Sequence, residues 1–340
     1  MSFSALNSPP LLSVLTVGCY ALLPVVQDTF RDKTIPWVVV KSTNVLVYAF
    51  SVWCVSQPGR YDSYAAIAED NQTGKEETSQ EENTSAGATG MRKMGTGRQG
   101  RTLLPPAGWA FVIWGPIFLG ELLMVSSQTT LAEGHALEET IRRITGPYVL
   151  AQAFQSLWTA SFRPKYNEGF YKYVSALNLA GIALSLSFCH QAFVTSKVSF
   201  SNLEYGMYFL PLALHFGWTT AASLVNVNGM FAMDDQVSAR SVAWLGHASV
   251  AAATALGVAI TLARTAPVYG GVIAWALSAV ASGLSRRLRE TEKEDPARVG
   301  VYGAKTQLLL SQAGAACCAL TTLYVTLSSS TRQGGLPQAL

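Results

Sequence analysis

Nine mostly apolar stretches run through this chain of 340 residues, and most are close to the length that crosses a lipid bilayer. A spanning helix needs about 20 predominantly apolar residues. Hydrophobic residues make up 49% of the chain and charged residues only 13%, well below the charged fraction of an ordinary soluble domain. We therefore expect an integral, multi-pass membrane protein of the all-α class.

The expected helices fall on either side of one polar segment. They cover residues 11–27 and 36–56 before it, and 103–127, 148–162, 170–193, 205–231, 241–263, 267–284 and 306–327 after it. Residues 11–27 lack the basic start of a secretory signal, so we interpret them as a short membrane helix rather than a cleaved signal. The polar segment is rich in Gly, Ser, Thr, Glu and Lys without an apolar period, which predicts disorder.

These features predict five parts. They are N-terminal membrane helices (1–56), a disordered cytosolic linker (57–102), a helical core (103–231), a C-terminal three-helix extension (239–328) and a tail (329–340). The linker is assigned to the cytosol because most Lys and Arg residues, including Arg286, Arg287 and Arg289, lie on its side of the membrane. The extension repeats small residues at four-residue steps, as at Gly270, Ala274, Ser278 and Ser282. Such faces let helices pack closely in lipid and could also join copies of the chain into a homo-oligomer.

Several classes of function are excluded by what the chain lacks. The formal net charge of +3 is small and scattered, so no nucleic-acid partner is expected. All five cysteines lie in apolar segments without histidines at ligand spacing, which argues against a metal site. A nucleophile with its base, a paired carboxylate and a glycine-rich phosphate loop cannot be identified, so we predict no catalytic residues and favour a binding protein over an enzyme.

Residues 103–121, LLPPAGWAFVIWGPIFLGE, carry the most informative pattern. The proline pair Pro105–Pro106 is a typical helix start, and Pro116 is expected to kink the helix. Trp114, Phe118 and Glu121 fall at i, i+4 and i+7, so they share one helix face. A lone carboxylate at this depth is either a ligand contact or a paired residue near the interface.

Other intramembrane polar residues repeat this combination of aromatic and polar groups. Gln155 precedes Trp158 by three residues, and His215, Trp218 and Asn226 form one stripe of a later helix. Each intramembrane polar group is a site hypothesis, although bonding between neighbouring helices is the alternative. His215 has no carboxylate partner that the sequence reveals.

Four tryptophans on three of these helices, Trp109, Trp114, Trp158 and Trp218, describe a flat-walled apolar pocket. For Trp109 alone an interfacial position is favoured. Pockets between helices that combine aromatic walls with a few polar groups are typical small-molecule sites. Flat conjugated molecules would stack well against indole rings.

The sequence resembles the TspO/MBR family of tryptophan-rich sensory proteins and translocator proteins. The residues that carry the resemblance are Pro105, Pro106, Trp109, Phe111, Trp114, Trp158, Phe162, Pro211, Gly217, Trp218, Ala222 and Asn226. It implies a five-helix bundle whose first helix is 36–56, with extra transmembrane helices that bring the total to about nine. Ala151 and His215 stand where the family pattern has other residues, which leaves the ligand open.

Members of that family bind porphyrins and, in some cases, sterols or aromatic drugs. The resemblance therefore implies a receptor or carrier for a porphyrin, haem or similar hydrophobic ligand. Our candidate ligand-binding residues are Trp109, Trp114, Phe118, Glu121, Gln155, Trp158, His215, Trp218 and Asn226. A secondary transporter of a hydrophobic small molecule and a porphyrin-modifying membrane enzyme are the alternatives.

Overall fold

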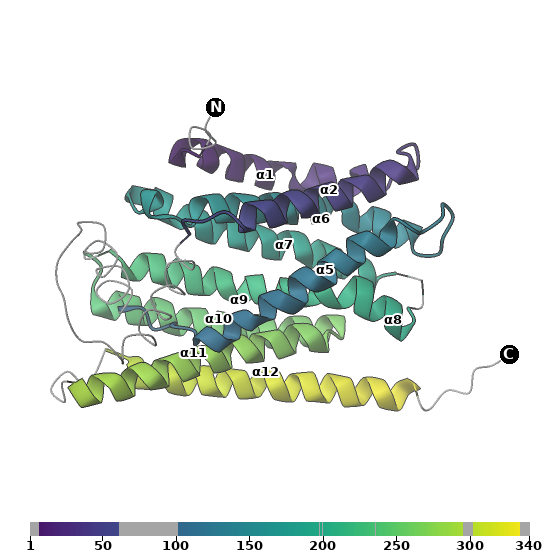
Figure 1. Cartoon of the computed structure of the whole chain (residues 1–340). Coiled ribbons are helices and arrows are strands. Elements are labelled where there is room, and N and C mark those ends of the chain that lie inside the picture. The colour runs from purple at the N-terminus through teal and green to yellow at the C-terminus, as the bar shows by residue number, and fades with distance from the viewer. Residues whose placement is uncertain are drawn as a thin grey trace, which may run out of the picture.

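The computed structural model describes residues 7–60, 101–196, 198, 200–234, 236–294 and 302–333. Within these residues every regular element is a helix (Figure 1). Seven helices of this part are long and apolar enough to cross a membrane. The prediction of an all-α, multi-pass membrane protein is therefore confirmed. Most of the predicted linker and both ends of the chain fall outside the described residues.

Nine long helices are found in the described part, one for each predicted stretch. They are α1 (Pro9–Thr29), α2 (Trp37–Val55), α5 (Trp114–Gln128), α6 (Glu138–Ser161), α7 (Val174–Val194), α9 (Leu210–Ala232), α10 (Ala239–Arg264), α11 (Pro267–Glu294) and α12 (Ala304–Gln333). A 3-10 helix, η4 (Gly108–Ile113), leads directly into α5. A short helix α8 (Asn202–Glu204) and a π-helix, η7 (Tyr205–Phe209), lead into α9.

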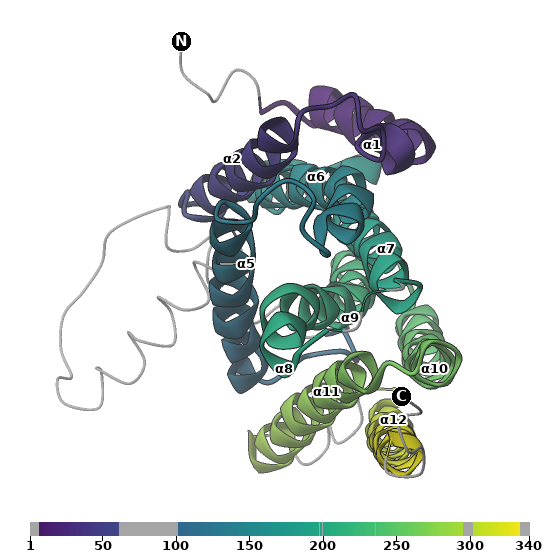
Figure 2. The same ribbon diagram turned by 90° about the vertical axis from the view of Figure 1, so that its right-hand side faces the viewer.

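Five of the helices form a closed ring. Viewed along the helix axes, α2 lies against α5, α5 against α9, α9 against α7, α7 against α6, and α6 against α2 (Figure 2). We call these five helices the ring. The first helix, α1, packs on the outside of α6 and α7. The extension, α10 to α12, packs on the outer side of α9 and is held to the ring mainly by α11.

A glycine sets the contact between α1 and the ring. A Cβ atom added at Gly146 of α6 would collide with the backbone oxygen of Val26 of α1. The missing side chain therefore lets the two helices approach to backbone distance, as small residues do in membrane proteins.

The predicted helix 103–127 was wrong at its start. Pro105 and Pro106 are not helical, and regular helix begins only at Gly108. The segment lies across α11, where the backbone N–H of Ala107 donates to the carbonyl of Ala279 at 2.9 Å. Gly283 leaves space for this approach, because a Cβ there would collide with the carbonyl oxygen of Pro105. Tertiary contact with a small-residue helix thus outweighs the local helix-start signal.

Pro116 does not kink α5 as expected from the sequence. It is the third residue of that helix, directly after the 3-10 segment ends. Proline is tolerated in the first turn, because the N–H group that it lacks has no partner within the helix there. The change from 3-10 to α-helix occurs at Trp114, so this indole is placed at a junction between two backbone geometries.

The predicted helix 148–162 was also wrong at its start, because α6 begins ten residues earlier, at Glu138. Arg142 lies in its second turn and is only 3% exposed. Its guanidinium donates to Glu138 at 2.7 Å and to the carbonyl of Ile35 at 2.9 Å, and it lies 5.5 Å from the ring of Trp37. The Arg142 charge is balanced by the Glu138 carboxylate, four residues earlier on the helix, and its guanidinium also donates to a backbone carbonyl. A buried helix can therefore begin with a charged turn.

Candidate functional site

A buried carboxylate stands at the centre of the ring. Glu121 of α5 is 1% exposed and faces α6 and α9. One carboxylate oxygen lies 2.6 Å from Nδ1 of His215. The other accepts hydrogen bonds from Nε2 of Gln152 at 2.8 Å and from the hydroxyl of Tyr148 at 3.1 Å. Three helices therefore meet at one side chain.

This arrangement explains how an acid is tolerated at such depth. A buried carboxylate is costly unless it is paired and hydrogen-bonded. The bond between Glu121 and Nδ1 of His215 completes this set of partners. That bond fixes the orientation of the imidazole. The structure thus supplies the carboxylate partner that the sequence had not revealed for His215.

Gln152 and Tyr148 were missed as members of the site. Tyr148, Gln152 and Gln155 fall at i, i+4 and i+7 of α6, so helical spacing could have placed all three on one face. The pattern was hidden because the helix was expected to begin at residue 148, which made the tyrosine look like a helix end.

An aromatic cluster lies beside this carboxylate, with Trp114 at its centre. The Trp114 ring stacks on Trp158 with centroids 6.1 Å apart and on Phe118 at 5.3 Å. It meets Trp218 at 6.2 Å and His215 at 5.6 Å, both edge to face. These geometries are the preferred ones for aromatic pairs. The structure therefore brings together indoles from α5, α6 and α9, as well as the histidine held by Glu121.

Several buried polar atoms of the same cluster have no hydrogen-bond partner among the described residues. They are both amide atoms of Gln155, Nε1 of Trp158, Nε1 of Trp218 and Nε2 of His215. An unsatisfied buried donor or acceptor costs about 1–3 kcal/mol. Four side chains in one small region carry this cost, and both indole groups and the glutamine amide can donate. The region is thus suited to a molecule that carries acceptor atoms.

Two candidate residues lie away from the cluster. Trp109 is 44% exposed and meets Trp275 of α11 edge to face, with centroids 4.6 Å apart. Asn226 accepts a hydrogen bond from the hydroxyl of Ser175 at 2.8 Å, which joins α9 to α7. The contact of Asn226 with Ser175 matches the helix-bonding alternative for that residue.

The polar interior continues beyond the cluster as a contact between helices. Nδ2 of Asn44 in α2 donates to Gln128 of α5 at 2.8 Å and to Thr145 of α6 at 3.0 Å. All three residues are fully buried. This cluster joins the three helices on that side of the ring. In the extension, His247 of α10 is hydrogen-bonded to Gln307 of α12.

In the described part of the chain, no three His, Cys, Asp or Glu side chains lie close enough together to bind a metal ion. A groove of about 530 Å³ lies between α11 and α12, away from the indoles. Inside the five-helix ring, the side chains of Trp114, Trp158 and Trp218 contact one another beside Glu121. A ligand among these side chains would replace aromatic contacts that they now make with one another.

The five-helix ring encloses a buried carboxylate and an aromatic cluster. This combination defines a polytopic membrane protein whose interior carries the kinds of groups that contact small-molecule ligands. A family model described as TSPO-like protein matches residues 84–294, which is more than half of the chain. The chain belongs to this family, as its proline and tryptophan pattern predicted. The match extends beyond the predicted core and includes α10 and α11. A search of curated proteins gave no match, and neither did a search of solved structures.

Proposed function

We propose that the protein is a membrane receptor or carrier that binds a flat conjugated ligand of the tetrapyrrole type inside the ring. Trp114, Trp158 and Trp218 would stack on the ligand, while Gln155 and His215 would contact its polar groups. Family membership supports a hydrophobic small-molecule ligand. The choice of a porphyrin follows from the indole walls, since large planar rings gain most from such stacking.

The observation that carries this proposal is the set of unpartnered donors around Trp114. Two indole N–H groups and the Gln155 amide have no acceptor among the described residues. Porphyrins with carboxylate side groups offer planar area and strong acceptors in one molecule. Hydrogen bonds to a charged acceptor are about twice as strong as neutral ones, which would offset the cost of keeping these donors buried.

The aromatic contacts indicate how such a ligand would enter. Trp114 is only half-buried, whereas Trp158 and Trp218 are 8% and 4% exposed. Rotation of the Trp114 side chain would expose the faces of its neighbours. The ligand would then lie between Trp114 and Trp158, with one indole stacked on each of its faces.

Tryptophan fluorescence tests the proposal directly. Added protoporphyrin is expected to quench the emission of the purified protein with a saturable curve. The double variant Trp114→Ala, Trp218→Ala should lose most of this quenching, whereas the control Trp244→Ala should keep it, because Trp244 is 62% exposed on α10. Equal quenching in the double variant and the wild type would refute the site.

A carrier and a receptor differ only in whether the ligand crosses the membrane. Proteoliposomes loaded with a porphyrin acceptor would report ligand-dependent flux for a carrier and binding without flux for a receptor. The Glu121→Gln variant is a useful companion, because it keeps the shape of the side chain but removes the carboxyl group that pairs with His215. Loss of binding in this variant supports a role for the carboxyl group.

A further inference from the structure

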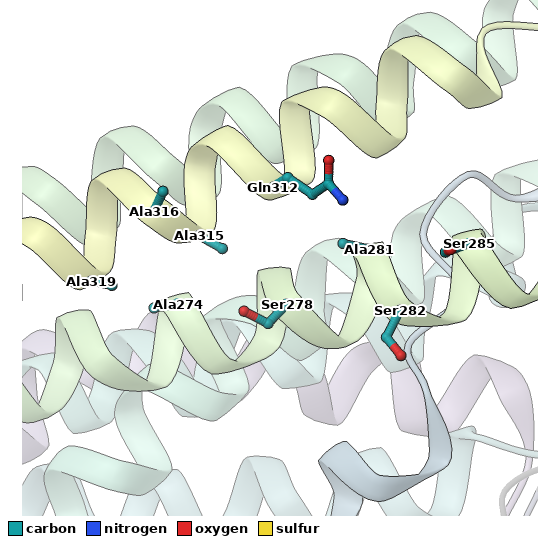
Figure 3. A pocket seen from close by; sticks show the side chains of 9 residues that line it. All are labelled: Ala274, Ser278, Ala281, Ser282, Ser285, Gln312, Ala315, Ala316 and Ala319. Atoms are coloured by element: carbon teal, nitrogen blue, oxygen red, sulfur yellow. The ribbon is translucent and has the colours of Figure 1, made fainter.

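The groove between α11 and α12 lies outside the ring and shows a gradient of polarity along its length. Its lining is Ala274, Ser278, Ala281, Ser282, Ser285, Gln312, Ala315, Ala316 and Ala319. Alanines alone line one end, while Ser282, Ser285 and Gln312 gather at the other (Figure 3). An apolar end and a hydrogen-bonding end match an amphiphile better than a uniformly apolar occupant.

The polar end lies where the two helices leave the apolar span. The membrane-length part of α11 ends at Arg289, and that of α12 begins at Ala304. Arg289 donates to the hydroxyl of Ser285, a lining residue, at 3.2 Å. Lys305 is exposed at the start of α12 and lies two turns before Gln312 on the same helix face. Two cationic side chains therefore stand at the polar end of the groove.

The Gln312 amide also indicates an amphiphilic occupant whose polar part lies near Arg289 and Lys305. This side chain is exposed on a membrane-length helix, extends toward α11 in Figure 3, and has no hydrogen-bond partner among the described residues. A polar amide without a partner is unfavourable in hydrocarbon. At roughly 12 Å from the start of α12, by the helical rise of 1.5 Å per residue, it is placed below the level of the cations. A ligand with ester oxygens beneath its headgroup would satisfy it.

We propose that this groove binds one anionic phospholipid, with its headgroup at Arg289 and Lys305, its ester region at Ser285 and Gln312, and an acyl chain along the alanines. Charge complementarity selects the headgroup, since basic side chains at the membrane surface attract anionic lipids. The small side chains leave the volume for the chain. The site lies between α11, which the family model matches, and α12, which lies outside the matched residues, and it is independent of the ligand proposed for the ring.

Native mass spectrometry of the full chain in detergent tests the proposal, with equal amounts of dioleoyl phosphatidylglycerol and dioleoyl phosphatidylcholine added. Wild-type protein should retain one phosphatidylglycerol per chain. Ala319→Leu should lose it, because the larger side chain fills the apolar end. Ala313→Leu is the matched control, since Ala313 is also exposed on α12 but does not line the groove. Equal retention in the two variants would overturn the proposal.

A second pair of variants tests the headgroup. Arg289→Gln should lower the preference for phosphatidylglycerol over phosphatidylcholine about fivefold, the worth of one basic residue near the membrane surface. Arg240→Gln removes an exposed arginine at the start of α10 and should leave the preference unchanged. An unchanged preference in Arg289→Gln would overturn the assignment of the headgroup. A wild-type dimer that Ala319→Leu converts to monomers would show that a second copy occupies the groove instead.

Discussion

The ring and the extension solve the same problem, packing in lipid, by different means. The ring fills its interior with aromatic rings and buried polar groups, such as Glu121 with His215 and Asn44 with Gln128. The extension packs through glycine and alanine, as at Gly257 and Gly270, where an added Cβ would collide with a neighbouring helix. A polar interior can exchange its partners for those of a ligand, whereas close backbone packing serves as a support. The difference places hydrogen-bonded polar groups inside the ring and close backbone contacts in the extension.

The sharpest test of this contrast is the removal of the buried carboxylate. Glu121→Ala would leave Tyr148, Gln152 and His215 without their shared acceptor, and loss of one member of a buried pair costs about 3–5 kcal/mol. We expect a loss of this size in the free energy of unfolding, measured by denaturant titration in micelles. The control Gln312→Ala in the extension should change it by less than about 0.5 kcal/mol. Similar losses in both variants would break the comparison.

The second test addresses close packing in the extension. Gly283→Ala would push α11 away from the carbonyl of Pro105, and overpacking of this kind costs about 1–3 kcal/mol. Gly271→Ala is the matched control on the same helix, because its added Cβ would meet nothing closer than 4.0 Å. Since alanine favours helix over glycine by up to about 1 kcal/mol, that variant should be neutral or more stable. Thermal unfolding in detergent would distinguish the two.

A smaller effect is expected where the two regions meet. The indole N–H of Trp275 in α11 donates to the carbonyl of Ala110 in η4 at 3.2 Å. Trp275→Phe keeps an aromatic partner for Trp109 but removes this bond, so a loss of about 1 kcal/mol in unfolding free energy is expected. A Trp109→Phe variant serves as control, because it keeps the hydrogen bond. If the two variants lose equal stability, the bond does not help to hold η4.

The smallest effect is a dependence on pH at the surface. Lys172 donates to Asp234 at 2.8 Å, and this bond lowers the pKa of the Asp234 carboxyl below its ordinary value. A lowered folded pKa contributes stability that is present above the unfolded pKa, about 3.9, and is lost as the pH falls. The melting temperature should therefore decrease slightly below about pH 4. Asp234→Asn should remove that part of the decrease, whereas a decrease of the same size in this variant would assign it to other carboxylates.

The sequence was sufficient for the class, the family and the position of most helices. Apolar length located all nine long helices of the described part, because burial in lipid leaves a strong compositional signal. Their ends were predicted less well. The start of α6 was missed because the charge of Arg142 is satisfied by Glu138 and by a backbone carbonyl from a distant segment. The proline pair was misread because its segment lies on α11, a contact that no local pattern reveals.

The candidate site was only partly accessible from the sequence for a similar reason. The face shared by Trp114, Phe118 and Glu121 follows from helical spacing, and the structure brings Trp158, His215 and Trp218 to it. The pairing of Glu121 with His215 joins residues 94 positions apart in the chain, so spacing within one helix could not reveal it. Asn226 shared a stripe with His215, yet about three turns of helix separate them, and its contact is Ser175.

The position of α2 has a consequence for any truncated version of this protein. The residues that match the family model begin at 84, after α2 has ended, yet α2 forms the wall between α5 and α6. Tyr48 of α2 donates to the carbonyl of Phe118, and Asn44 bridges α5 and α6. A fragment that starts at residue 84 would therefore have a gap on one side, through which lipid could reach the charged interior. Supplying α2 as a separate peptide would restore the missing wall.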